Sequence, residues 1–170
     1  DSGWSGSGTA VCGVNYQWIN VPSCTADPCT PSGNVANSNK AAAGSITGKT
    51  AGTVLVSCFM GYSGSGTATC GTNGQFNKIE CVECKMGYYQ DSAGSTTCKV
   101  CKKGEYMNEN KATSCKLCTQ GEWSDQAANE CTSCTEGRYT SETGAGDCKY
   151  CPKGRWSSLV GVKNFEECEG

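Results

Sequence analysis

A short sequence motif that begins and ends with cysteine occurs five times between Cys84 and Cys168. Each copy opens with a cysteine, has a glycine three residues later and an aromatic residue five residues later, and closes its loop with a second cysteine. The glycines are Gly87, Gly104, Gly121, Gly137 and Gly154; the aromatic residues are Tyr89, Tyr106, Trp123, Tyr139 and Trp156; the closing cysteines are Cys98, Cys115, Cys131, Cys148 and Cys168. After two intervening residues the next copy opens, at Cys101, Cys118, Cys134 and Cys151. A period of 16 or 17 residues held over five copies indicates a repeat array.

One such unit is too small to fold alone, because its only large apolar group is a single aromatic ring. A disulfide offsets part of the entropy cost, by roughly 3 kcal/mol for a loop of this length. The glycine is predicted to occupy a turn that needs positive φ, or a close backbone approach to the ring. We therefore expect a thin rod of β-turns and short hairpins with little helix, in which the aromatic of one unit covers the disulfide of the next.

The composition is that of a disulfide scaffold rather than a chain with one sizeable core. The 170 residues include 16 cysteines, 23 glycines and no histidine, with a formal net charge of −2. The even cysteine count predicts full pairing in an oxidising location, secreted or at the cell surface. We find no signal peptide and no apolar run long enough to cross a bilayer, and so expect a mature piece or a segment of a longer protein. Neither half is basic enough to predict nucleic-acid binding.

The first part of the chain contains an internal duplication. The stretch from Gly3 to Cys24 resembles the stretch from Gly61 to Cys81, so that Cys12 matches Cys70. The second copy has an upstream half that starts at Cys29 and includes a predicted strand over 53–57, which is rich in β-forming residues. The first copy has no upstream half, so residues 1–28 are predicted to be the C-terminal half of a module.

Residues 29–81 resemble a sushi (complement control protein) domain. The resemblance is carried by four cysteines (Cys29, Cys58, Cys70 and Cys81), the Gly61-Tyr62 pair after the second, Gly66 before the third, and Phe76 between the third and fourth. It implies a small β-sandwich with disulfides Cys29–Cys70 and Cys58–Cys81, and with Phe76 packed on the bridges where the family usually has tryptophan. Cys12 and Cys24 then remain, to pair with each other, with a neighbouring subunit or with residues missing from this segment.

The repeats from Cys84 onward resemble the ephrin-receptor-like cysteine-rich repeats, which are similar in style to growth-factor-receptor and tumour-necrosis-factor-receptor modules. The favoured pairing is Cys84–Cys98, Cys101–Cys115, Cys118–Cys131, Cys134–Cys148 and Cys151–Cys168. The predicted domains are a partial sushi-like module at 1–28, a complete one at 29–83, and five repeats at 84–100, 101–117, 118–133, 134–150 and 151–170. The fold class is thus small, disulfide-rich and mostly β: sushi β-sandwich modules followed by an elongated array of short cysteine-rich repeats.

Other chemistries are less compatible with the pattern. Cys-x-x-Cys pairs can bind zinc, but a set of zinc sites would leave Cys84 and Cys168 without partners. Without histidine the usual catalytic pairs are absent, and the carboxylates are scattered singly. We therefore expect no enzyme activity, catalytic residue, metal or cofactor. The five phased aromatic residues are expected to pack in the core or between repeats, and the Ser/Thr-rich first half is a candidate for O-linked glycans.

Two functions fit these features. The first is a structural segment of a large extracellular multidomain protein, which forms or decorates a cell-surface filament, appendage or matrix and whose half module is completed by another segment or subunit. The second is a receptor or adhesin ectodomain that binds a protein or glycan ligand through its sushi domain. The expected partners are copies of the chain or other extracellular proteins.

Overall fold

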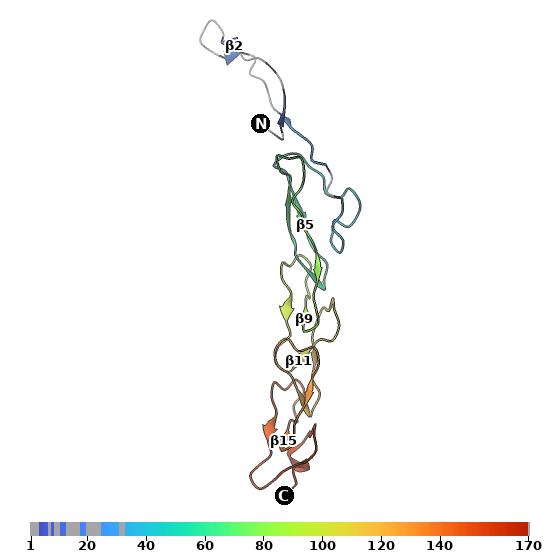
Figure 1. Ribbon diagram of the computed structural model, residues 1–170, viewed down its shortest axis with the longest axis vertical. Coiled ribbons are helices and arrows are strands. Elements are labelled where there is room, and N and C mark those ends of the chain that lie inside the picture. Colours follow the sequence, from blue (N-terminus) through green and yellow to red (C-terminus); the bar gives the residue numbers. More distant parts are fainter. Residues whose placement is uncertain are drawn as a thin grey trace. The chain divides into compact units, whose positions relative to one another are not determined.

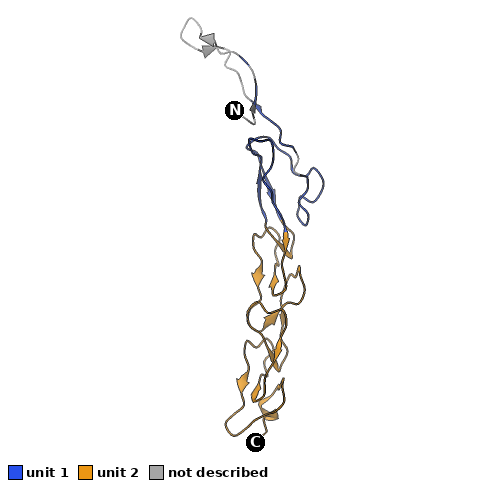
Figure 2. Cartoon of the chain, in the orientation of Figure 1, with its two compact units in different colours: residues 1–57, 65–81 blue, residues 58–64, 82–170 orange. Residues whose placement is uncertain are grey.

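The computed structural model describes residues 4–6, 8, 11–12, 18–19, 25–30 and 33–169. The chain divides into two compact units, shown in different colours in Figure 2. Unit 1 comprises residues 1–57 and 65–81, and unit 2 comprises residues 58–64 and 82–170. Within the described residues the regular structure is strand, with one short 3-10 helix, η1 (Phe165–Glu167), and no α-helix.

Unit 1 is built from antiparallel strand pairs (Figure 1). They are β1 (Trp4–Ser5) with β4 (Thr25–Ala26), β2 (Val11–Cys12) with β3 (Trp18–Ile19), and β5 (Thr53–Val56) with β7 (Gly66–Thr69). The predicted strand before Cys58 corresponds to β5, whose Val56 lies opposite Gly66 on β7.

The core of unit 1 is a cluster of apolar side chains. Its buried members are Cys29, Val35, Ile46, Val56, Ala68, Cys70 and Phe76. The alternation of β5 places Val56 inside and Leu55 in solvent, as expected for a strand with one buried face. A Cβ added to Gly48 would lie 3.2 Å from the Phe76 ring, so the ring packs directly against that backbone.

Unit 2 is an elongated array of two-residue hairpins. They are β6 (Tyr62–Ser63) with β8 (Val82–Glu83), β9 (Tyr88–Tyr89) with β10 (Lys99–Val100), β11 (Glu105–Tyr106) with β12 (Lys116–Leu117), β13 (Glu122–Trp123) with β14 (Thr132–Ser133), and β15 (Arg138–Tyr139) with β16 (Lys149–Tyr150). In the fifth repeat an isolated bridge joins Trp156 to Glu169 in the same way. The prediction of a small, disulfide-rich, mostly β fold with an elongated array is confirmed.

The array has one hairpin more than the five repeats predicted from the sequence. Residues 58–64 and 82–83 form this leading hairpin, in which Cys58 and Gly61 take the places of the opening cysteine and the turn glycine. The sequence signal was the Cys81-Val82-Glu83-Cys84 joint, which has the same spacing as the joints between later repeats.

Disulfides close the loop of every repeat. The bridges are Cys84–Cys98, Cys101–Cys115, Cys118–Cys131, Cys134–Cys148 and Cys151–Cys168, with Cα atoms 5.7–5.9 Å apart. In unit 1, Cys29 is bonded to Cys70. Cys58 and Cys81 are also disulfide-bonded. Cys24 and the side chain of Cys12 lie outside the described residues, so their pairing stays a prediction.

Candidate functional site: the junctions between repeats

Consecutive repeats are joined by backbone hydrogen bonds. At the junction of the second and third repeats, the Cys118 N–H donates to Gly104 O and the Gly104 N–H donates to Ser124 O, both at 2.9 Å. The Ala127 N–H donates to Cys101 O at 2.9 Å, and the Met107 N–H donates to Ala128 O at 3.1 Å. The equivalent four bonds, at 2.8–3.4 Å, form at the other three junctions of the five repeats. The array is therefore held by main-chain groups, and the loop side chains take no part in these bonds.

The turn glycines of the first three repeats also bring each of these repeats against the next but one. A Cβ added to Gly104 would lie 1.9 Å from Gly144 O, two repeats further on, and one added to Gly87 would lie 2.3 Å from Ala127 O. Both glycines have φ near +80°, which side chains disfavour. The predicted positive φ is confirmed, and the close approach is to a carbonyl at Gly87, Gly104 and Gly121 but to the Trp156 ring at Gly137. Gly154, in the fifth repeat, has φ +83° and nothing within 4 Å.

The buried position of each repeat lies six residues after the opening cysteine. We call it the sixth position; it is occupied by Gln90, Met107, Ser124, Thr140 and Ser157, all buried. In three repeats its side-chain oxygen accepts a hydrogen bond from the N–H two residues later, at 3.3 Å. Sequence reasoning missed this position, although four of its five residues are polar and small enough, or flexible enough, to organise a loop.

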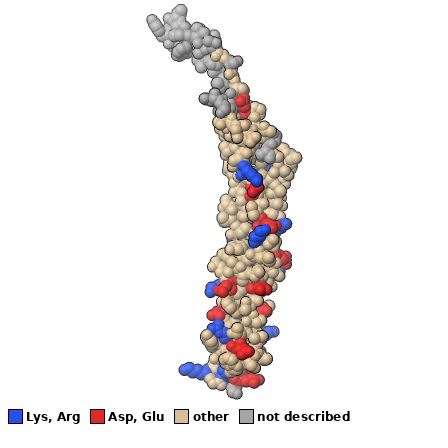
Figure 3. All heavy atoms as spheres, viewed as in Figure 1, with Lys and Arg blue, Asp and Glu red and all other residues tan. Residues whose placement is uncertain are grey.

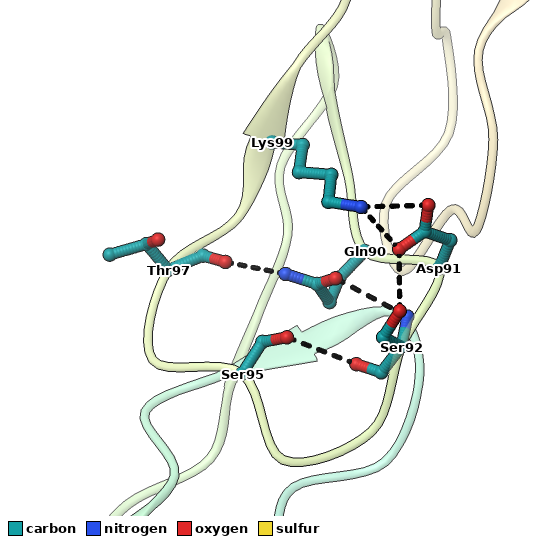
Figure 4. Close-up of polar contacts among 6 residues, drawn as sticks. All are labelled: Gln90, Asp91, Ser92, Ser95, Thr97 and Lys99. Carbon is teal, nitrogen blue, oxygen red and sulfur yellow. Dashed lines mark hydrogen bonds and ion pairs between the residues drawn. The ribbon is translucent and has the colours of Figure 1, made fainter.

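Figure 4 shows the sixth position of the first repeat. The Gln90 side-chain amide donates to Thr97 O at 2.5 Å and its Oε1 accepts from the Ser92 N–H, so that it spans the loop from the inside. Outside the loop, Lys99 Nζ lies 2.6 and 2.8 Å from the two Asp91 oxygens. A buried amide and a surface ion pair thus fix the same loop from two sides.

A comparison with known protein families identifies the family to which these repeats belong. The family model described as tyrosine-protein kinase ephrin type A/B receptor-like matches residues 71–118 and 121–168, more than half of the chain. The chain belongs to the ephrin receptor-like family. The first match begins inside the stretch that resembles a sushi domain. A search of curated proteins gave no match to the chain.

Disulfide-bonded ephrin receptor-like repeats indicate an extracellular location. The described residues include no helix suited by length and apolar character to cross a membrane.

The phased aromatic residues of the ephrin receptor-like repeats are not core residues. Tyr89, Tyr106, Trp123 and Tyr139 are half-buried, and Trp156 is 58% exposed. Tyr106 joins the next repeat through its backbone, in a parallel bridge to Ala128. The Trp156 ring does lie against the backbone of Gly137 in the preceding repeat, where an added Cβ would meet it at 2.3 Å. We predicted packing in the core or between repeats; none of the five rings is fully buried, because the strand turns the residue after the ring toward the inside, and the Trp156 ring packs between repeats.

Ion pairs recur along the surface of the repeats. Lysines just after a closing cysteine pair with loop carboxylates in three repeats: Lys99 with Asp91, Lys116 with Glu109, and Lys149 with Glu142. The hydrogen bond from Lys99, and then that from Ser92, lowers the pKa of Asp91. The hydrogen bond from Lys149 lowers the pKa of Glu142 in the same way. These pairs are exposed, so they add little to stability and leave the surface charged in both signs.

The cysteines of unit 2 are engaged in disulfides and so present no free thiolates as ligands. In the part of the chain that the structure describes, no group of three or more histidine, cysteine, aspartate or glutamate side chains is arranged to hold a metal ion.

Proposed function

We propose that this chain is a non-enzymatic structural segment of a large extracellular protein, which forms or decorates a cell-surface filament, appendage or matrix. The observation that carries the proposal is the repeated junction, in which four backbone hydrogen bonds and a glycine–carbonyl contact join consecutive and alternate repeats. Such an array transmits force along its length through the main chain and its disulfides. No apolar core has to stay intact for it to do so.

The exposed chemistry fits a spacer better than a catalyst. The charged groups between residues 84 and 150 are mostly held in surface ion pairs. The proposed partners are copies of the chain or other extracellular proteins, with O-linked glycans on the Ser/Thr-rich first half. Residues 29–57 and 65–81 are proposed to be the sushi-like part of the predicted 29–83 module, which the Cys29–Cys70 bridge and the Phe76 packing support, while residues 58–64 and 82–83 belong to the leading hairpin of unit 2. Residues 1–28 are proposed to be a partial copy of that module.

A recognition role for unit 1 is the second candidate. It is favoured by Leu55, an apolar side chain on β5 that is 64% exposed beside a buried core. In that case the chain is a receptor or adhesin ectodomain that contacts a protein or glycan through the sushi-like domain.

Two measurements on native material separate the candidates. Disulfide-linked peptides are mapped by mass spectrometry without reduction, and the same sample is imaged by negative stain before and after dithiothreitol. The structural proposal predicts filaments or fibrous material that contains the chain and that loses order on reduction. Single compact particles, in which all 16 cysteines pair within one chain, would overturn it. Loss of ligand capture in a Leu55→Ser variant would then support the recognition role.

A further inference from the structure

One residue in the loop of each repeat has positive φ. We call it the loop residue; it is Gly94, Lys111, Ala127, Gly144 and Gly161 in the five repeats, with φ between +61° and +82°. Its N–H donates to the carbonyl of the opening cysteine of the preceding hairpin, at 2.8–2.9 Å. From the second repeat onward its own carbonyl lies against the turn glycine two hairpins earlier, at the place that a Cβ of that glycine would need. The loop residue is therefore the point at which these repeats meet both of the hairpins that precede them.

A second position faces the loop residue across this step of two hairpins. It is the residue just before an opening cysteine, which we call the joint residue: Glu83, Val100, Leu117, Ser133 and Tyr150. Three joint residues lie against the loop residue two hairpins further on: Glu83 Oε2 is 3.5 Å from Lys111 Nζ, a Cβ added to Gly144 would lie 3.0 Å from Leu117 Cδ2, and one added to Gly161 would lie 3.8 Å from Ser133 Oγ. The same two positions therefore meet repeatedly along unit 2.

The two members of a pair complement each other in charge or in size. Glu83 and Lys111 carry opposite charges, and Lys111 Nζ also lies 5.9 Å from the centre of the Tyr62 ring in the same hairpin as Glu83. Leu117, a large apolar side chain, instead faces Gly144, which has no side chain. A side chain at position 144 would be pressed against Leu117, because 3.0 Å is shorter than an ordinary contact between carbon atoms. Exchanging members between the two pairs would set a lysine against a leucine and leave Glu83 facing a glycine.

Lys111 occupies the loop position although its backbone favours glycine there. Its φ of +63° is one that side chains disfavour, and three of the five loop residues are glycine. The neighbouring Asn110 donates from Nδ2 to Glu83 Oε1 at 3.2 Å, so two side chains of the second loop hold this carboxylate. Basic and acidic side chains are interspersed along the face of unit 2 drawn in Figure 3, as pairing of this kind requires. The lysine therefore has a contact at this step that a glycine could not make.

We infer that the joint residue and the loop residue form matched pairs, which specify the hairpin against which each repeat packs. The backbone bonds do not carry this information, because the same four bonds form at each junction of the five repeats. Specific packing needs a feature that favours the correct neighbour and disfavours the others. Opposite charge in the Glu83–Lys111 pair and the difference in size in the Leu117–Gly144 pair supply such features. The inference goes beyond the proposed function and holds for a structural segment and for an ectodomain alike.

The test transfers the charged pair to the place of the apolar one. Leu117→Glu, Gly144→Lys and the variant with both substitutions form a double-mutant cycle in the full chain. The readout is the hydrogen-exchange protection factor of the amide at position 144, which donates to Cys118 O at 2.8 Å. Each single variant should lower it, and the double variant should be protected at least about threefold better than the product of the two single effects. Leu117→Glu with Gly161→Lys is the matched control, because Gly161 faces Ser133 instead; here the single effects should simply multiply.

The natural charged pair provides a second cycle, which decides alone if Gly144→Lys does not fold. Both side chains are accessible, 53% for Lys111 and 29% for Glu83, so their exchange leaves buried packing unchanged. Glu83→Lys and Lys111→Glu should each lower the protection of the amide at position 111, which donates to Cys84 O at 2.8 Å. The double reversal should again be better protected than the product of the single effects. This excess should shrink between about 0.05 M and about 1 M sodium chloride, because salt screens exposed charges.

Excess protection in the matched cycles that is absent from the Gly161→Lys control supports the inference. Single effects that simply multiply in both cycles would overturn it, and so would an equal excess in the control. Neither result depends on whether native material contains filaments, so the matched pairs and the proposed function stand or fall separately.

Discussion

Units 1 and 2 bury different kinds of group. Unit 1 encloses Ile46, Val56 and Phe76 in an apolar cluster together with the Cys29–Cys70 bridge. The buried positions of unit 2 are mainly its opening cysteines, its interior turn glycines and the mostly polar residues of the sixth position. Unit 1 thus gains stability chiefly by removing apolar surface from water, at about 25 cal/mol per Å². Unit 2 gains its stability from disulfides and from main-chain hydrogen bonds repeated at every junction.

A repeat array need not have a hydrophobic core if its junctions are made by the backbone. Loops can then vary in side chain, as they do from Gln90 to Ser157 at the sixth position, while the junction persists. What cannot vary are the cysteines and the interior glycines.

Removing one disulfide of the array is expected to open a whole repeat. The Cys101→Ser/Cys115→Ser variant should lose about 2–5 kcal/mol and should expose the amides of residues 101–118 to hydrogen exchange. The control is Cys29→Ser/Cys70→Ser, which should lower the stability of unit 1 and leave exchange in unit 2 unchanged. If the amides of residues 101–118 remain protected from exchange without the Cys101–Cys115 disulfide, then the disulfides are not what stabilises unit 2.

Interior and terminal glycines are expected to respond differently to the same substitution. Gly104→Ala places a Cβ within 1.9 Å of Gly144 O as well as in an unfavourable φ, whereas Gly154→Ala meets only the φ penalty. Urea unfolding should show a loss of about 3 kcal/mol for the first and about 1 kcal/mol for the second. Equal losses would mean that the contact between alternate repeats is not tight.

A hydroxyl introduced at a buried position of unit 1 should lower stability more than a hydroxyl removed from a buried position of unit 2. Val56→Thr buries an unpaired hydroxyl in the apolar cluster and is expected to cost about 1–3 kcal/mol. Thr140→Val is the reverse exchange at the sixth position, with nearly the same volume; it removes the hydroxyl that accepts from the Glu142 N–H at 3.3 Å and should cost no more than about 1 kcal/mol. Thermal unfolding of both variants provides the measurement. A larger loss for Thr140→Val than for Val56→Thr would contradict the view that unit 2 lacks an apolar core.

The smallest effect is expected from pH. The pKa of Asp91 is lower in the folded protein than in the unfolded chain, so its pairing with Lys99 stabilises the fold above the unfolded pKa. This contribution disappears as pH falls through the lowered pKa. Asp91→Asn should therefore be slightly less stable than the wild type at pH 7 and equal to it at about pH 2, well below the unfolded value of about 3.9. Glu136→Gln, at an exposed carboxylate with no ion pair in the described part of the chain, is the control. If the stability difference between Asp91→Asn and the wild type were the same at both pH values, the ion pair with Lys99 would not be its cause.

The sequence was sufficient to predict the hairpins and the disulfides of the repeats, because the spacing of cysteine, glycine and aromatic residues is local and constant. It did not reveal that Gly104 meets a residue two repeats away, since that contact depends on how successive hairpins twist. The sixth position was overlooked because Ser124 and Thr140 look like ordinary loop residues until their neighbours in space are known. The leading hairpin was missed because Cys58 and Cys81 were assigned to the sushi-like domain, although the Cys81–Cys84 spacing was visible.

The most direct test of the backbone junctions is amide hydrogen exchange, measured by NMR, at the turn glycines. The N–H groups of Gly87, Gly104, Gly121 and Gly137 donate to carbonyls of the following repeat, at 2.8–2.9 Å. They should exchange slowly, whereas the Gly154 amide, which has the same local sequence pattern but no backbone partner among the described residues, should exchange quickly. Rapid exchange at Gly104, at a rate close to that of Gly154, would contradict an array held together by its main chain.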